Sequence, residues 1–189
     1  MTHVKDQHDS GCKRFILLPA DVDAGAYFSS CGKYRPKLWH TWGRFPARVL
    51  FLMMNPSGAS HLSSDSTVAK CGMYARRWGY DGLYVGNVCD YRSTDPKGLL
   101  KEPNPVSEEN LNNIEDMANV CDLIIVAHGK LPGALQKHAD KTVQMLLDLD
   151  RDLHILKLSK NGIPMHPLAR GKNHMSKDLQ PILWKKGKR

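Results

Sequence analysis

The sequence predicts an α/β fold, a three-layer sandwich with a mostly parallel central sheet and helices on both faces. Short continuous apolar runs, typical of strands buried on both faces, occur at residues 48–54, 83–88 and 123–127. Segments with apolar residues at helical spacing separate these runs. Because strand and helix alternate, right-handed crossovers between parallel strands are the expected connection.

Length and composition favour one globular domain with a polyanionic partner. The chain has 189 residues, of which 41% are apolar and 24% charged, as in a folded domain with a core. Its 27 Lys and Arg exceed its 19 Asp and Glu, which gives a formal charge of +8 and favours nucleic acid as partner. We expect a leader over residues 1–13, a single α/β domain over 14–184 and a solvated basic tail over 185–189.

The cysteines and the hydropathy pattern suggest an intracellular protein. Five cysteines are spread along the chain without a C-x-x-C motif, which argues against a disulfide framework and a structural zinc site. No signal peptide opens the chain, and no apolar run approaches the ~20 residues needed to cross a bilayer. We therefore expect a cytoplasmic monomer without membrane contact, metal or cofactor.

In the first half of the chain, residues 34–42 alternate weakly and predict an edge strand. Residues 48–54 predict the first buried strand. Asn55-Pro56 ends it, because Pro has no N–H to give to a β-ladder. The polar residues 63–67 offer caps for a helix that ends at Gly79. The apolar face of that helix is expected to carry Val68, Cys71, Ala75 and Trp78.

The second half repeats the alternation of strand and helix. Several Pro residues predict an irregular loop over 90–106. Ser107 is expected to cap the helix after it, with Glu108 and Glu109 in the first turn. The remaining elements are a strand at 83–88, a central parallel strand at 123–127, a helix at 133–148 and a last strand at 153–158, which a turn at Asn161-Gly162 follows.

Polar residues follow four of the predicted strands. The carboxyl ends of parallel strands meet at one edge of the sheet, where open α/β sheets bind ligands. No phosphate-loop, dinucleotide-binding, nucleophile-elbow or zinc-deaminase motif occurs in the chain. The residues expected to converge are Asn55, Pro56 and Ser57, then Asn87 with Arg92 beyond it, then His128 with Lys130, and finally His166.

Four stretches resemble a bacterial and phage family described only as a domain of unknown function. They read L-F-L-M-M-N-P-S from residue 50, Y-A-R-R-W-G-Y-D-G-L-Y-V-G-N-V from residue 74, Y-R-S-T-D-P from residue 91 and G-I-P-M-H-P-L from residue 162. The resemblance extends from about Tyr34 to Leu168.

A more distant resemblance is to the uracil-DNA glycosylase superfamily. Asn-Pro after one strand, Asn at the end of the next and His-Pro after the last strand are similar to its motifs, in the mismatch-specific uracil/thymine form. The resemblance implies that Asn55 orients water, Asn87 reads a flipped base, and His166 donates to the base carbonyl. Pro56, Ser57 and His128 would lie beside the base. The paired cysteines of the iron–sulfur branch are absent, so no cluster is expected.

The function expected from this resemblance is DNA glycosylase-like hydrolysis of an N-glycosidic bond at a uracil-like or modified base, in repair or modified-base processing. Leu168 would act as a wedge in the DNA, and cations would hold phosphates. Asp65 or Asp90 could supply a carboxylate, although Asp65 is more typical of a helix cap. Two alternatives are hydrolysis of a free nucleotide or nucleoside, and a non-catalytic nucleic-acid-binding module. The expected DNA contacts are Arg92, Lys130, Leu168, Arg170 and Lys172.

Overall fold

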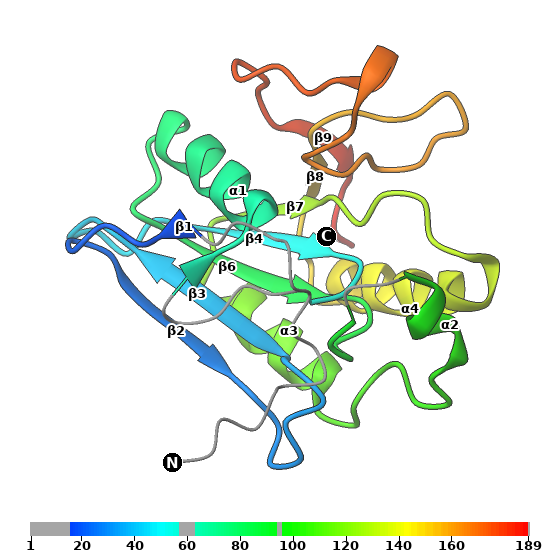
Figure 1. Ribbon diagram of the computed structural model, residues 1–189. Coiled ribbons are helices and arrows are strands. Elements are labelled where there is room, and N and C mark those ends of the chain that lie inside the picture. Colours follow the sequence, from blue (N-terminus) through cyan, green and yellow to red (C-terminus); the bar gives the residue numbers. More distant parts are fainter. Residues whose placement is uncertain (1–15, 57–62, 94–95, 189) are drawn as a thin grey trace.

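The computed structural model describes residues 16–56, 63–93 and 96–188, which form an α/β fold with one seven-stranded sheet (Figure 1). The predicted leader over 1–13 and Ser57 lie outside the described residues. The strands of this sheet are β2 (Asp23–Tyr27), β3 (Lys37–Thr41), β4 (Arg48–Met53), β6 (Gly82–Asn87), β7 (Leu123–Val126), β8 (Leu153–Ile155) and β9 (Ile182–Lys185). A separate antiparallel pair consists of β1 (Ile16–Leu17) and β5 (Ser63–Ser64).

Four helices accompany the sheet in the described part of the chain. They are α1 (Ser66–Arg77), α2 (Pro96–Lys101), α3 (Asn110–Asn119) and α4 (Gly133–Asp148), and a short 3₁₀ turn covers Gly171–Asn173. The predicted helix at 133–148 is confirmed at both ends. Asp65 caps α1 by accepting from the N–H groups of Thr67 and Val68, both at 2.9 Å, and Gly79 after it has φ +82°.

The sheet is mixed, so the predicted mostly parallel sheet is wrong. The strand order is β2-β3-β6-β4-β7-β8-β9. Strands β6, β4, β7 and β8 pair in parallel, whereas β2–β3, β3–β6 and β8–β9 pair antiparallel. Parallel pairing needs a crossover connection, and the helical crossovers serve only the central strands.

The two ends of the sheet account for the other corrections to the strands. The strand expected at the edge, β3, is interior, because β2 pairs along its outer side. The strand expected to be last is followed by β9, which includes Lys185. Lys188 donates its N–H to the Leu147 carbonyl at 3.2 Å and its ammonium pairs with Asp148. These two contacts hold the tail to α4 at Lys188, while Lys185, Lys186 and Lys188 are exposed, as expected of a solvated tail.

The segment between β6 and α3 also differs from the prediction. It contains the short helix α2, where an irregular loop was expected. Helix α3 begins at Asn110, after Ser107. Both the N–H and the hydroxyl of Ser107 donate to the Asp90 carboxylate, the N–H at 2.7 Å, so Ser107 is held by Asp90 instead of capping the helix.

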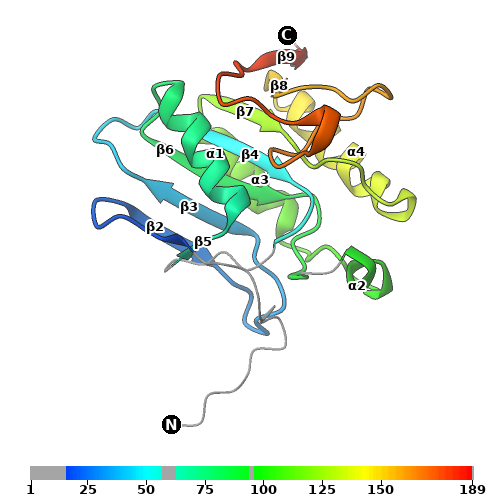
Figure 2. The same cartoon turned by 45° about the horizontal axis from the view of Figure 1, so that its top comes forward.

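Each face of the sheet carries its own apolar core (Figure 2). Helix α1 packs against one face, here called the α1 face, over a cluster that includes Phe51, Met53 and Val85. Helices α3 and α4 cover the opposite face, here called the α4 face, over a cluster that includes Leu52 and Val126. Within the described residues, no helix has the length and apolar character needed to cross a membrane.

Gly25 in β2 provides a test of the outer hairpin. It lies opposite Trp39 in β3, and a Cβ at Gly25 would lie 1.9 Å from the Trp39 ring. We expect Gly25→Ala to lower the free energy of unfolding by about 1–3 kcal/mol, because the ring must move out of its place. Urea unfolding measures this. The matched control is Gly133→Ala at the start of α4, where an added Cβ meets nothing within 4 Å. Equal losses in the two variants would contradict the described packing of β2 on β3.

Candidate functional site

The carboxyl ends of β6, β4 and β7 lie level at one edge of the sheet. Met53 pairs with Asn87, and the ladder continues as the Val88 N–H donates to the Met53 carbonyl at 2.9 Å. On the other side of β4, the Ala127 N–H donates to the Leu52 carbonyl at 2.8 Å. The segments that follow these strands therefore emerge side by side, as the sequence predicts.

The segment after β8 joins this edge through Gly129. Its N–H donates to the Pro164 carbonyl at 3.1 Å, and its φ is +72°. A Cβ on Gly129 would lie 3.3 Å from the Cβ of His166, so the absence of a side chain allows a close approach. This contact brings His166 next to the end of β7.

Asn87 lies on the α1 face at the end of β6. Gly86 faces α3, since a Cβ there would lie 2.9 Å from Met117, and side chains alternate along a strand. Asn87 is 1% exposed, and its side-chain nitrogen Nδ2 has no hydrogen-bond partner in the described structure. Its backbone carbonyl accepts from Asn110 at 2.9 Å. A buried, unsatisfied amide costs free energy, so this group is a candidate to bind a ligand.

Asn55 is fixed by its own amide. Its Nδ2 donates to the carbonyl of Ser93 at 2.7 Å and to that of Pro56 at 3.1 Å. Pro56 is buried. Because both amide hydrogens have acceptors, the oxygen Oδ1 is the remaining polar group of the side chain, and it can accept a hydrogen bond from water.

His166 is half-buried and oriented by the turn that follows it. Its Nδ1 accepts from the Leu168 N–H at 3.1 Å, so the neutral ring carries its proton on Nε2. Burial lowers the pKa of His166, and the charge of Asp65 partly opposes this shift. At neutral pH the ring is therefore uncharged and presents an N–H donor.

Two buried basic groups near Asp65 were missed by the sequence analysis. Arg35 and His40 are 2% and 4% exposed. Burial lowers the pKa of Arg35 to about 10 and that of His40 to about 4, and the negative charge of Asp65 opposes both shifts. His40 lies two residues after the buried Leu38 in β3, and this spacing on one strand face was the available signal.

The two candidate carboxylates have different roles. Asp65 is 6% exposed and caps α1, and its charge acts on Arg35, His40 and His166. Burial raises the pKa of Asp90, while its hydrogen bonds to Ser107 lower it. Both carboxylate oxygens of Asp90 accept hydrogen bonds from Ser107, whereas the charge of Asp65 acts on His166. We therefore include Asp65, and not Asp90, in the candidate site.

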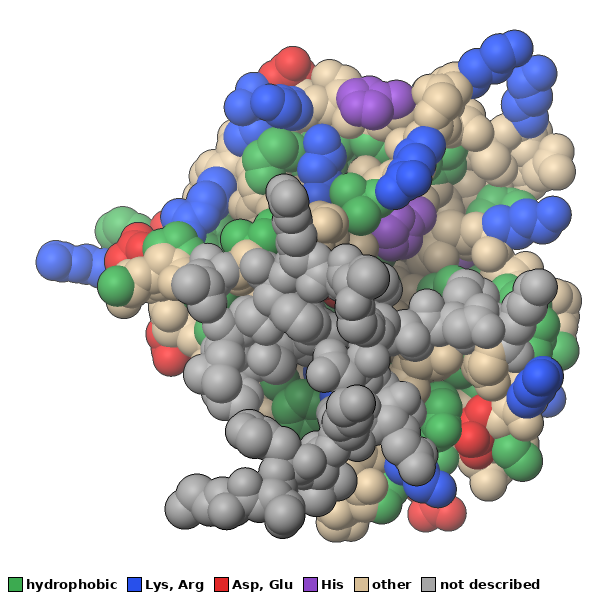
Figure 3. Space-filling model, in the orientation of Figure 1, with side chains coloured by type: hydrophobic (Ala, Val, Ile, Leu, Met, Phe, Trp, Pro, Cys, Tyr) green, Lys and Arg blue, Asp and Glu red, His purple; other side chains and the backbone are tan. Residues whose placement is uncertain are grey.

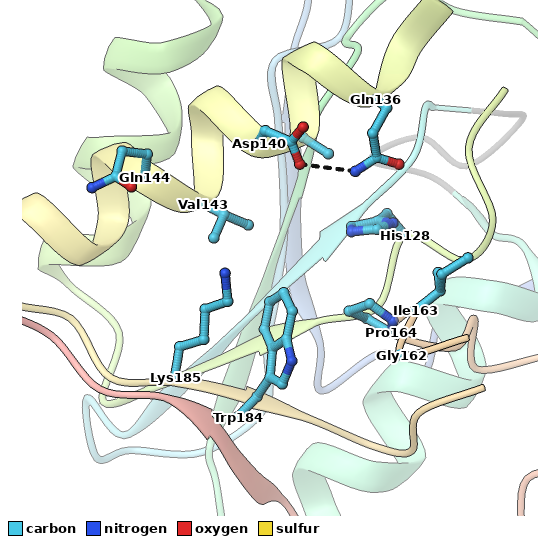
Figure 4. Close-up of a pocket in the computed structure, with 11 residues that line it drawn as sticks. His128, Gln136, Asp140, Val143, Gln144, Gly162, Ile163, Pro164, Trp184 and Lys185 are labelled. Atoms are coloured by element: carbon cyan, nitrogen blue, oxygen red, sulfur yellow. Dashed lines mark hydrogen bonds between the residues drawn. The ribbon is translucent and has the colours of Figure 1, made fainter. Parts of the chain in front are cut away.

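The structure does not bring His128 to the other candidates. Ala127 packs in the cluster of the α1 face, so the next side chain points to the α4 face. There His128 lines a cavity of about 320 Å³ with Gln136, Asp140 and Trp184 (Figure 4). Its Nδ1 bonds the Gly129 carbonyl at 2.7 Å, and burial lowers its pKa.

The predicted DNA contacts lie in three places. Arg92 donates to the Gly32 carbonyl at 3.0 Å and lies 5.1 Å from the centre of the Phe28 ring, so it ties the loop after β6 to the β2–β3 connection. Lys130 and Lys172 instead line a groove of about 580 Å³ together with His166. Figure 3 shows one side of the molecule, and Lys and Arg side chains with histidine between them lie over its upper half. Leu168 is half-buried and Arg170 exposed, both in the turn after His166.

Together these groups offer an acceptor for water, a buried amide and a neutral imidazole donor at one sheet edge. The four cysteines among the described residues, Cys31, Cys71, Cys89 and Cys121, are free thiols. No group of three or more His, Cys, Asp or Glu within the described ranges has a metal-binding arrangement.

A family model described as "Protein of unknown function (DUF1643)" matches residues 35–168, which confirms the expected resemblance to a family of that kind. The match contains Asn55, Asn87 and His166. No curated protein and no solved structure matches the chain.

The buried His40 predicts how stability depends on pH. Its pKa in the fold, about 4, lies below its ordinary value of 6.5, so folding favours the neutral ring. The stability that the fold gains from keeping the His40 ring neutral is fully present above pH 6.5 and is lost as the pH falls towards 4. Between about pH 7 and about pH 5, we expect the wild type to lose about 2 kcal/mol more unfolding free energy than His40→Gln.

Urea unfolding at the two pH values measures the difference. The control variant is His174→Gln at an exposed position, which should follow the wild type. If His40→Gln shows the same pH dependence as the wild type, the buried neutral imidazole does not contribute as described.

Proposed function

The chain belongs to the family described as "Protein of unknown function (DUF1643)", and we propose that it is a DNA glycosylase-like enzyme that cleaves the N-glycosidic bond of a uracil-like or modified base in DNA. The proposal includes a uracil-DNA-glycosylase-like architecture. It assigns Asn55 and His166 to catalysis and Asn87 to recognition of the base.

The main support for the proposal is the buried side-chain amide of Asn87. Its Nδ2 is without a hydrogen-bond partner among the described residues, although the residue is 1% exposed. An amide donor in such surroundings is stabilised by a ligand that brings its own acceptor. The carbonyl oxygen of a pyrimidine-like base is an acceptor of this kind, and enzymes that act on a base in DNA turn it out of the stack.

His166 supports the chemistry of the leaving group. Cleavage of an N-glycosidic bond leaves negative charge on the base. A donor that is already oriented stabilises this charge as it develops. The neutral His166 ring presents its Nε2–H, because Nδ1 is occupied by the Leu168 N–H. In this proposal, Nε2–H donates to a carbonyl oxygen of the departing base.

Asn55 and Asp65 support the chemistry on the sugar side. The amide of Asn55 does not accept a proton at neutral pH, so it orients water through Oδ1 and does not act as a base. The buried charge of Asp65 favours the positive charge that builds up on the sugar. Water that is only oriented reacts slowly, so we expect a slow enzyme.

The Lys130 and Lys172 side chains favour a polymeric substrate over a free nucleoside. Both line the groove that His166 also lines. A free nucleoside has no phosphate for these ammonium groups and a free nucleotide has phosphate at one end only, whereas DNA has one on each side of the reacting nucleotide. This basic surface supports the choice of DNA.

The proposal is tested by incubating the protein with DNA that carries a panel of normal and modified bases, followed by detection of abasic sites. At least one base should be released. Asn55→Ala, Asn87→Ala and His166→Ala should each lower the rate about 100-fold, the order measured when one oriented hydrogen-bonding group is removed.

The matched controls are Asn112→Ala in α3 and His138→Ala in α4, which should retain the wild-type rate. Thermal unfolding checks that every variant is folded. A folded wild-type protein that releases no base from any substrate would refute the proposed activity, and so would full activity of Asn87→Ala and His166→Ala.

A further inference from the structure

A groove of about 580 Å³ lies beside His166, and it is lined by Lys130 and Lys172, two of the DNA contacts expected from the sequence. Three segments form it: the residues after β7, the turn at 159–166, and the 3₁₀ turn region up to Asn173. Each segment contributes one lysine, namely Lys130, Lys160 and Lys172. We call it the lysine groove. Its volume is in the range of pockets that hold small organic ligands.

The floor and the rim of the lysine groove differ in chemistry. Pro164 and Met165 are buried in its floor, with Ile163 and Ala169 half-buried beside them. The three lysines are exposed at the rim, and no Asp or Glu is among the residues that line the groove. An apolar floor below a ring of cations is complementary to a planar base attached to phosphate.

Polar side chains at the rim add hydrogen-bonding groups for a base. Asn161 and Asn173 are exposed and line the groove from two different segments. An amide offers both a donor and an acceptor, so it can pair with the edge of different bases. These residues complete the set of contacts that a nucleotide uses.

The lysine groove shares His166 with the proposed base site but does not include the other two residues of that site. His166 lines the groove, whereas Asn55 and Asn87 do not. Gly129 also lines it, at the point where that residue closely approaches His166. A nucleotide in the groove is therefore the neighbour of the one whose base meets Asn87.

We propose that the lysine groove binds the base and phosphate of the nucleotide adjacent to the reacting one, so that the preferred substrate is single-stranded DNA. This inference rests on the proposed function. A duplex would have to release two neighbouring bases from the stack, and each release costs free energy. In a single strand both bases are already free to turn outward.

Binding is measured by fluorescence anisotropy with a labelled single-stranded DNA oligonucleotide of mixed sequence. Two further probes are the same strand in a duplex, and an oligonucleotide of equal length made only of abasic sugar phosphates. The single strand should bind most tightly. The abasic probe should bind about tenfold more weakly, the order expected when one base contact is lost.

Two variants test the groove itself. Ala169→Leu fills part of the floor without adding an aromatic ring on which a base could stack, and it should weaken binding of the single strand while leaving the abasic probe less affected. Lys160→Ala with Lys172→Ala should reduce the slope of log affinity against log salt by about 1.4, because each phosphate contact to single-stranded DNA contributes about 0.7.

The matched control is Lys137→Ala with Lys141→Ala on α4, which removes the same charge outside the groove and should leave the slope unchanged. Equal affinity for the abasic probe, equal affinity for the duplex, or equal effects of the two lysine pairs would each overturn the inference. Since these measurements need no cleavage, DNA that binds as expected but is never cleaved supports the groove and contradicts the proposed function.

Discussion

The parallel pairing of β6, β4 and β7 holds the site together. The ladder sets Met53 opposite Asn87 and extends past the strand ends, through the Val88 N–H on one side of β4 and the Ala127 N–H on the other. A shift by one residue would turn every side chain to the opposite face of the sheet. Asn87 would then leave the α1 face, where Asp65 caps its helix. The register therefore decides which polar groups share one environment.

The alternation of side chains between the two faces of the sheet also explains how much of the site the sequence could predict. Apolar runs and helical spacing were sufficient for β4, β6, β7, α1 and α4, and the topology alone brings Asn55, Asn87 and His166 to one edge. His128 was expected there too, but its place one residue after Ala127 turns it to the α4 face. A pattern that identifies a strand does not identify its last residue. The face to which a residue near the strand end points depends on where the strand ends.

Features that depend on contacts between residues far apart in the chain could not be predicted from local sequence patterns. Strand β2 contains Gly25 and little apolar alternation, and it pairs with β3 where the Trp39 ring covers the glycine. Ser107 has the composition of a helix cap, yet Asp90, 17 residues earlier, holds it. The buried charges of Arg35 and His40 next to Asp65 likewise arise from tertiary packing. Local propensity is overridden in each case by a long-range contact.

The most direct measurement of the central claim follows the Asn87 side-chain amide and the His166 ring N–H by ¹H–¹⁵N NMR while free nucleobases are added one at a time. If both groups donate to the same ligand, as proposed, one base will shift both signals together and saturably. A titration in which no base moves the Asn87 signal, or in which the His166 signal moves without it, would rule out a shared base site. In that case the unsatisfied amide at the end of β6 is not a base-binding group.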